Sequence, residues 1–272
     1  MNEKVIQFGP EKNMLGIVSV PDSIDENKPA IIILNSGLIH RVGPYRMTVV
    51  LARELASLGF LVFRFDLPNI GDSTSYKTTL PYKERTVSEI SSALDVITKR
   101  YKINQFVSVG LCTGAMNTHI ITCHDERVKG AVMLDAYSYP TLNFLIKRYA
   151  NKLYKLLNPL FVLKLIKERL IDNEAAYGTF EGVDYWETPP QAEITADLKA
   201  LMNRDTELMY IYSGGLNEYF NYTEQFRDNF KSIDFKDHLD VHFLEEADHT
   251  YTLQKDRDHM LSLIVSWFQS KF

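Results

Sequence analysis

The feature that most constrains the fold of this chain is a regular alternation of short apolar segments with segments of helical periodicity. The apolar segments are rich in Ile, Val and Phe, as expected of strands buried on both faces of a sheet. The expected strands are 5–8, 14–20, 30–34, 60–65, 106–109, 129–134, 208–212 and 241–244, and the expected helices are 45–58, 87–100, 113–123, 222–230 and 253–272. This order predicts an α/β fold with a mostly parallel, doubly wound sheet and helices on both faces.

The alternation stops between residues 137 and 203, where helical stretches and irregular aromatic sequence follow one another without a clear strand. We interpret 137–203 as a helical cap inserted into the sheet domain. Residues 1–136 and 204–272 then form the α/β core.

Composition excludes several classes of protein. The 272 residues carry a formal net charge of −5, without the basic footprint of a nucleic-acid-binding protein. No apolar run approaches the roughly 20 residues of a membrane helix, and the polar start does not resemble a signal peptide. Two cysteines are too few for a disulfide framework. We therefore expect a reduced, cytoplasmic protein.

The motif Gly110-Leu111-Cys112-Thr113-Gly114 lies between an expected strand and an expected helix. Its spacing is that of the G-x-S-x-G nucleophile elbow, with cysteine in place of serine. A helix N-terminus behind Cys112 favours the thiolate, the nucleophilic form. The alternative interpretation is a buried structural cysteine in a strand-to-helix turn.

The expected catalytic base is His249, which follows the last strand and precedes the last helix. This position suits the chain order nucleophile, acid, base. For the acid we favour Glu218, in the turn after strand 208–212, and then Asp135, with Asn217 as a further way to orient the imidazole. Apart from His40, the remaining histidines are expected in structural or solvated positions: His119, His124, His238, His242 and His259.

An oxyanion hole is expected from the backbone amides of Thr113 and Leu38, the latter in the loop after strand 30–34. In the same loop, His40 and Arg41 either line the mouth of the substrate pocket or, for Arg41, pair with a surface carboxylate. The aromatic residues expected to contribute to the pocket or its hinge are Tyr137, Tyr177, Phe180, Tyr185 and Trp186.

No cofactor or metal is expected. Asp66 and Asp72 are better explained by hydrogen bonds within turns, and no cluster with metal-ligand spacing stands out. A Gly-rich dinucleotide fingerprint is also lacking.

Together these motifs resemble the α/β-hydrolase superfamily, and within it the exosortase A system-associated hydrolases. The similar stretches are His40-Arg41-Val42-Gly43-Pro44-Tyr45-Arg46, Phe63-Arg64-Phe65-Asp66, Gly110-Leu111-Cys112 and Ala247-Asp248-His249-Thr250. The resemblance implies a bacterial cytoplasmic enzyme with a Cys-His site, often encoded near exopolysaccharide or lipid-modifying genes. The dienelactone hydrolases also carry cysteine at the elbow but resemble the rest of the chain less.

Residues 142–170 are basic and amphipathic in an otherwise acidic protein. Three interpretations remain open: a lid with a solvated basic face, a docking face for an acyl carrier protein or coenzyme A, and weak contact with an anionic membrane surface.

A cysteine nucleophile favours activated acyl substrates, because a thiolate is also a good leaving group and its adduct with an ordinary amide collapses backwards. The sequence therefore predicts a thioesterase or acyltransferase with an acyl-cysteine intermediate. The alternatives are an ester or lactone hydrolase of dienelactone-hydrolase type and a non-catalytic binding protein.

Overall fold

The structure is a computed structural model that describes residues 1–156, 188–217 and 219–272. Its centre is an eight-stranded sheet with the strand order β1-β2-β4-β3-β5-β6-β7-β8. The strands are β1 (Asn2–Phe8), β2 (Met14–Val20), β3 (Ala30–Ile33), β4 (Val62–Phe65), β5 (Phe106–Leu111), β6 (Val128–Leu134), β7 (Glu207–Ser213) and β8 (Leu239–Leu244). Strand β2 pairs antiparallel with β1 and β4, and the pairs from β4 to β8 are parallel. All eight expected strands are present, and the predicted fold class is confirmed.

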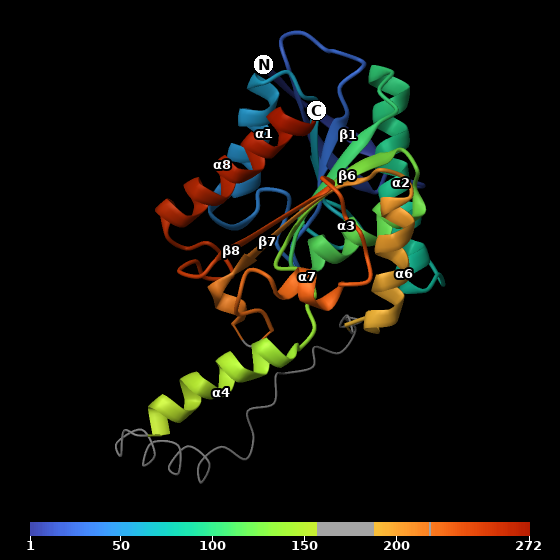
Figure 1. Ribbon diagram of the computed structural model, residues 1–272. Coiled ribbons are helices and arrows are strands. Elements are labelled where there is room, and N and C mark those ends of the chain that lie inside the picture. Colours follow the sequence, from blue (N-terminus) through green and yellow to red (C-terminus); the bar gives the residue numbers. More distant parts are fainter. Residues whose placement is uncertain (157–187, 218) are drawn as a thin grey trace, which may run out of the picture.

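Helices cover both faces of the sheet (Figure 1). One face carries α1 (Met47–Ser57) and α8 (Gln254–Lys271), and the other carries α2 (Tyr82–Tyr101), α3 (Thr113–His124) and α6 (Gln191–Met202). The shorter elements are η1 (Pro44–Arg46), η2 (Gly214–Leu216) and α7 (Gln225–Asn229).

The two faces are filled by alternate residues of the same strands. In β3, Ile31 and Ile33 pack in the cluster that contains α1 and α8, whereas Ala30 and Ile32 pack in the cluster that contains α2. Side chains of a strand point alternately to opposite faces, so a strand buried on both faces must be apolar throughout. This explains the unbroken apolar run that marks β3 in the sequence.

The range expected as a cap contains elements of two kinds. Helix α6 packs on the sheet, with Ile194, Leu198 and Leu201 buried in the cluster that also contains α3. Helix α4 (Leu142–Leu156) instead extends away from the α/β body (Figure 1). Residues 157–187 lie outside the described residues, so the division into core and cap stays a prediction.

None of the helices in the described parts of the chain is long and apolar enough to span a membrane.

The register of the parallel strands aligns their carboxyl ends at one edge of the sheet. Leu111 pairs with Leu134, Leu134 with Ile211, and Ser213 with Leu244. Open α/β sheets bind ligands outside the carboxyl ends of their strands. The loops that follow β3, β5, β6, β7 and β8 therefore converge on the region where a site is expected.

Candidate active site

Cys112 occupies a strained turn between β5 and α3. Its backbone angles are φ 57° and ψ −120°, a combination that costs a non-glycine residue about 1–3 kcal/mol and is typical of functional positions. The flanking glycines allow the turn: a Cβ at Gly110 would lie 2.1 Å from the Gly114 carbonyl oxygen, and one at Gly114 would lie 2.5 Å from the Asn35 oxygen. Cys112 is half-buried at this point. The backbone has the shape of a nucleophile elbow.

His249 and Asp135 meet beside this turn. His249 Nδ1 lies 2.8 Å from Asp135 Oδ2, and the Cys112 side chain is near enough to the same imidazole to raise its pKa. Asp135 directly follows β6, and His249 lies in the loop between β8 and α8. The carboxyl ends of β5, β6 and β8 thus bring a thiol, a carboxylate and an imidazole together.

The carboxylate of Asp135 is held by more than the histidine. Its side chain is fully buried, and it accepts hydrogen bonds from the Ser213 backbone N–H (2.6 Å) and hydroxyl (2.7 Å) at the end of β7. Ser213, at the end of the neighbouring strand β7, therefore holds the Asp135 carboxylate in place. Glu218, the acid favoured from the sequence, lies outside the described residues. Asn217 is exposed, and no hydrogen bond recorded for the described residues joins it to His249.

The Asp135 contact dominates the electrostatics of the histidine. The hydrogen bond to Asp135, and after it the nearby Cys112 side chain, raises the pKa of His249 from 6.5 to about 10, against the opposing effect of burial. A proton on this imidazole is stabilised because a buried carboxylate lies on one side of it. At neutral pH, His249 is therefore an imidazolium placed against a cysteine.

The loop after β3 is attached to the elbow through Thr113. The Gly37 N–H donates to Thr113 Oγ1 at 2.6 Å, so this loop amide is already used within the protein. The next residue, Leu38, is 75% exposed, and its amide has no acceptor among the described residues. The roles of Leu38 and Thr113 as oxyanion donors stay predictions.

A buried aspartate anchors the rest of this loop. Asp66, at 0% exposure, accepts a hydrogen bond from the Arg41 backbone N–H (2.6 Å) and forms an ion pair with the Arg41 guanidinium, which also binds Asp72 at 2.6 Å. Asp66 thus acts through hydrogen bonds, which reach beyond its own turn to Arg41. The pair of Arg41 with the exposed Asp72 matches one of the two roles expected for Arg41. His40 is exposed. Both His40 and Arg41 line a cavity of about 30 Å³, which has room for water but not for an acyl chain.

Tyr137 is buried beside His119 rather than at the surface. Its ring lies edge-on to the His119 imidazole, with 5.4 Å between centroids, and both residues line a cavity of about 150 Å³ between α3 and α6. Its contribution to substrate binding stays a prediction. Trp186, Tyr177, Phe180 and Tyr185 lie outside the described residues.

The expectation of solvated histidines is wrong for His119, which is 5% exposed. His238 is bound to Glu207 at 2.7 Å, and burial lowers the pKa of His242. His119 and Cys123 lie four residues apart on one helix and form, together with Asp197, a group of metal-ligand residue types that was not expected from the sequence. That spacing is the signal that points to the cluster.

Comparison with known proteins agrees with this architecture. A family model described as alpha/beta hydrolase fold matches residues 29–182, more than half of the chain. Curated protein sequences give no match.

Solved structures show the same fold across nearly the whole chain. They include a serine hydrolase without a lid from Xanthomonas campestris (11% identity, TM-score 0.55, covering 99% of this chain and 93% of that one). A hypothetical protein from Pseudomonas aeruginosa is similar at 13% identity and TM-score 0.64, covering 100% and 94%. An esterase from Pyrococcus furiosus is similar at 15% identity and TM-score 0.60, covering 99% and 92%. The chain belongs to the alpha/beta hydrolase fold family, and its elbow carries Cys112.

Proposed function

We propose that this protein is a cysteine-dependent acyl hydrolase or acyltransferase that works through an acyl-Cys112 intermediate. The observation that carries the proposal is the contact of His249 with both Asp135 and Cys112, at a strained elbow. An imidazolium next to a cysteine favours the thiolate, and the thiolate is the nucleophile.

In the first half of the reaction, the Cys112 thiolate attacks the acyl carbon, and the carbonyl π electrons move to the oxygen. The amides of Leu38 and Thr113 stabilise this oxyanion. When the intermediate collapses, the bond to the leaving group breaks, and the leaving thiolate or alkoxide takes the proton of His249. The products of this half are acyl-Cys112 and a neutral imidazole.

In the second half, His249 removes a proton from water or another acceptor as that acceptor attacks the acyl-cysteine. Cys112 leaves as a thiolate, and the imidazolium held by Asp135 is restored. Because acyl-cysteine is itself a thioester, the acyl group passes readily to water, an alcohol or an amine. This favours thioesters over amides as substrates and supports a thioesterase or acyltransferase.

A solvent-open cavity of about 660 Å³ supports a bulky acyl group. Residues of α4 and of the segments that follow β7 and β8 line it, and its charged side chains are Lys147, Glu224, Glu245 and Glu246. Gly215, which follows the lining residue Gly214, lies against the His249 backbone: a Cβ there would be 2.4 Å from the His249 amide nitrogen. The cavity therefore adjoins the loop that holds the histidine.

Helix α4 supports an acidic carrier for the donor, such as an acyl carrier protein or coenzyme A. Leu142, Ile146 and Tyr149 are 74%, 57% and 58% exposed, and the neighbouring Lys147 and Arg148 add positive charge. An exposed face that combines apolar and basic side chains fits a negatively charged partner. Contact with an anionic membrane is the competing use of the same face.

The resemblance to the exosortase A system-associated hydrolases is consistent with a cytoplasmic enzyme of this kind and adds no substrate. The deciding experiment is intact-protein mass spectrometry after brief exposure to a panel of acyl-coenzyme A thioesters and activated esters. We expect an acyl adduct on the wild type and none on Cys112→Ala. Cys123→Ala is the matched control and should keep the adduct.

Full turnover by Cys112→Ala, or an adduct that survives in this variant, would refute the cysteine mechanism. If the whole panel gives neither adduct nor turnover with the wild type, the proposal is also rejected. A lactone or ester hydrolase of dienelactone-hydrolase type, or a binding protein, then takes its place.

A further inference from the structure

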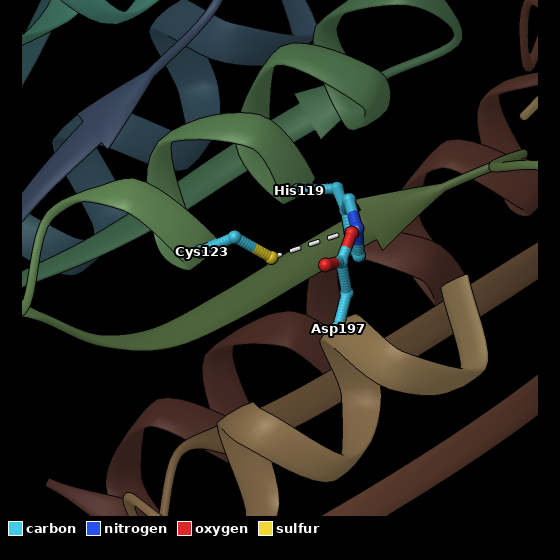
Figure 2. Close-up of side chains that lie close together, drawn as sticks. All are labelled: His119, Cys123 and Asp197. Carbon is cyan, nitrogen blue, oxygen red and sulfur yellow. Dashed lines mark hydrogen bonds and ion pairs between the residues drawn. The ribbon is translucent and has the colours of Figure 1, made fainter. Parts of the chain in front are cut away.

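Helices α3 and α6 bring a second group of reactive side chains together, away from the elbow. His119 and Cys123 lie one turn apart on α3, and Asp197 lies on the facing helix α6. Figure 2 shows the three side chains pointing toward one another. Cys123 lies eleven positions after Cys112 along α3, a rise of about 16 Å at 1.5 Å per residue, so this group is distinct from the candidate active site.

The distances within the group suit a tetrahedral metal ion. His119 Nε2 lies 3.6 Å from Cys123 Sγ and 2.9 Å from Asp197 Oδ2, and the three donor atoms all lie within 4.8 Å of one another. Bond lengths of about 2.3 Å to sulfur and about 2.0–2.2 Å to nitrogen and oxygen place tetrahedral donors roughly 3.4–3.6 Å apart. The sulfur–nitrogen distance already has this value, and the other pairs need side-chain shifts of about an ångström or less.

Burial and space also favour a bound ion. The His119 side chain is 6% exposed, so its Nε2 is a buried donor atom. All three side chains line the cavity of about 150 Å³ between α3 and α6. The cavity has room for an ion and for water as a fourth ligand.

The charges are those that a divalent cation would neutralise. The Cys123 thiol and the Asp197 carboxylate lie close to the same imidazole nitrogen. A metal ion would replace the thiol proton: the S–H bond breaks, a metal–sulfur bond forms, and one proton goes to solvent. A thiolate and a carboxylate then balance two positive charges.

The nearby cations do not occupy the site. Lys83 is paired with Glu193 at 3.4 Å, with both side chains about half exposed. Arg204 donates to the backbone oxygens of Thr122, Asp125 and Val128 at 3.2–3.4 Å. Their positive charges oppose cation binding weakly, because one is paired in solvent and the other is held by carbonyl groups.

We propose that His119, Cys123 and Asp197 form a binding site for one divalent metal ion of the zinc class, which fastens α6 to α3. One sulfur, one nitrogen and one oxygen donor suit Zn²⁺ and its spectroscopic substitute Co²⁺. The competing description is a metal-free cluster in which His119 pairs with Asp197 and Cys123 only packs beside them.

The experiment uses the full-length protein, stripped with a chelator and titrated with Co²⁺. We expect a thiolate-to-cobalt charge-transfer band and the visible bands of a tetrahedral ion, saturating at one equivalent. Zn²⁺ should displace the cobalt. At a hundredfold excess over the dissociation constant, Zn²⁺ should raise the Tm by roughly 5 °C.

Variants separate this site from the other thiol. The charge-transfer band should disappear in Cys123→Ser, and its intensity should fall at least tenfold in His119→Gln. It should persist in Cys112→Ala and in the exposed control His124→Ala. If circular dichroism shows that Cys123→Ser or His119→Gln is misfolded, Asp197→Asn provides a second test, because it keeps the shape of the side chain. No saturable band in the wild type, a band retained in Cys123→Ser, or a band lost in Cys112→Ala would each overturn the proposal.

Discussion

The contact between Asp135 and His249 gives the sharpest test of the candidate site, through the substitution Asp135→Asn. The change keeps the size of the side chain and removes its charge. In the wild type the buried carboxylate faces three donors, one from His249 and two from Ser213. An amide has only one oxygen, so its NH₂ group faces at least one of these donors.

A hydrogen bond to a charged group contributes about 1.5–3 kcal/mol, and 1.36 kcal/mol corresponds to one pKa unit. The His249 side chain is 34% exposed, so solvent screening limits the effect. We therefore expect the substitution to lower the His249 pKa, about 10 in the wild type, by about one to two pH units. A loss of the same size in transition-state stabilisation reduces kcat/KM about ten- to hundredfold.

The pKa of His249 is measured by NMR titration of its imidazole signals in the wild type, Asp135→Asn and Ser213→Ala. The serine variant removes one hydrogen bond and keeps the carboxylate, so its His249 pKa should stay closer to the wild-type value. An unchanged His249 pKa in Asp135→Asn would refute the assignment of Asp135 as the group that stabilises the imidazolium.

The remaining predictions concern stability and the loop after β3. Because the folded state raises the His249 pKa from 6.5 to about 10, its contribution to stability is complete below pH 6.5 and is lost as the pH rises to about 10; urea unfolding across this range should show the wild type losing more stability than Asp135→Asn. Asp66→Asn leaves the Arg41 guanidinium partly unpaired and should cost about 3–5 kcal/mol in urea unfolding; a loss below 1 kcal/mol would contradict the anchoring role. Thr113→Val removes the acceptor of the loop amide and should lower kcat/KM about two- to tenfold, whereas unchanged kinetics would show that this hydrogen bond does not position the loop. In Gly114→Ala the Cβ meets a backbone oxygen at 2.5 Å, so we expect a lower Tm and less soluble protein than in the solvent-exposed control Ala192→Gly.

The sheet could be predicted from the sequence because its strands are buried on both faces. Such strands must be apolar throughout, and the helices between them must be amphipathic. Both patterns are local and can therefore be recognised in the sequence. The elbow was visible for a related reason. The close approach of β5 to α3 excludes a Cβ at Gly110, and the backbone that follows β3 excludes one at Gly114. Both contacts restrict the residues on either side of Cys112.

The partner of the histidine was decided only by the tertiary structure. The sequence favoured the turn after β7 for the acid, but β7 ends there in Ser213, and the carboxylate that reaches His249 comes from the end of β6. Adjacent parallel strands end side by side, so a carboxylate on either one can reach the same imidazole. The register of the strands and the direction of the side chains decide which carboxylate reaches the imidazole. Neither property can be inferred from the order of the residues.

The group formed by His119, Cys123 and Asp197 follows the same principle. The helical spacing of His119 and Cys123 is local and can be found in the sequence, but the third side chain comes from α6, more than seventy residues further along the chain. Strands, helices and the elbow around Cys112 could thus be located from the sequence, because those properties depend on neighbours in the chain. The packing of distant segments decided which charged groups meet, because electrostatic and hydrogen-bonding partners are chosen by distance in space.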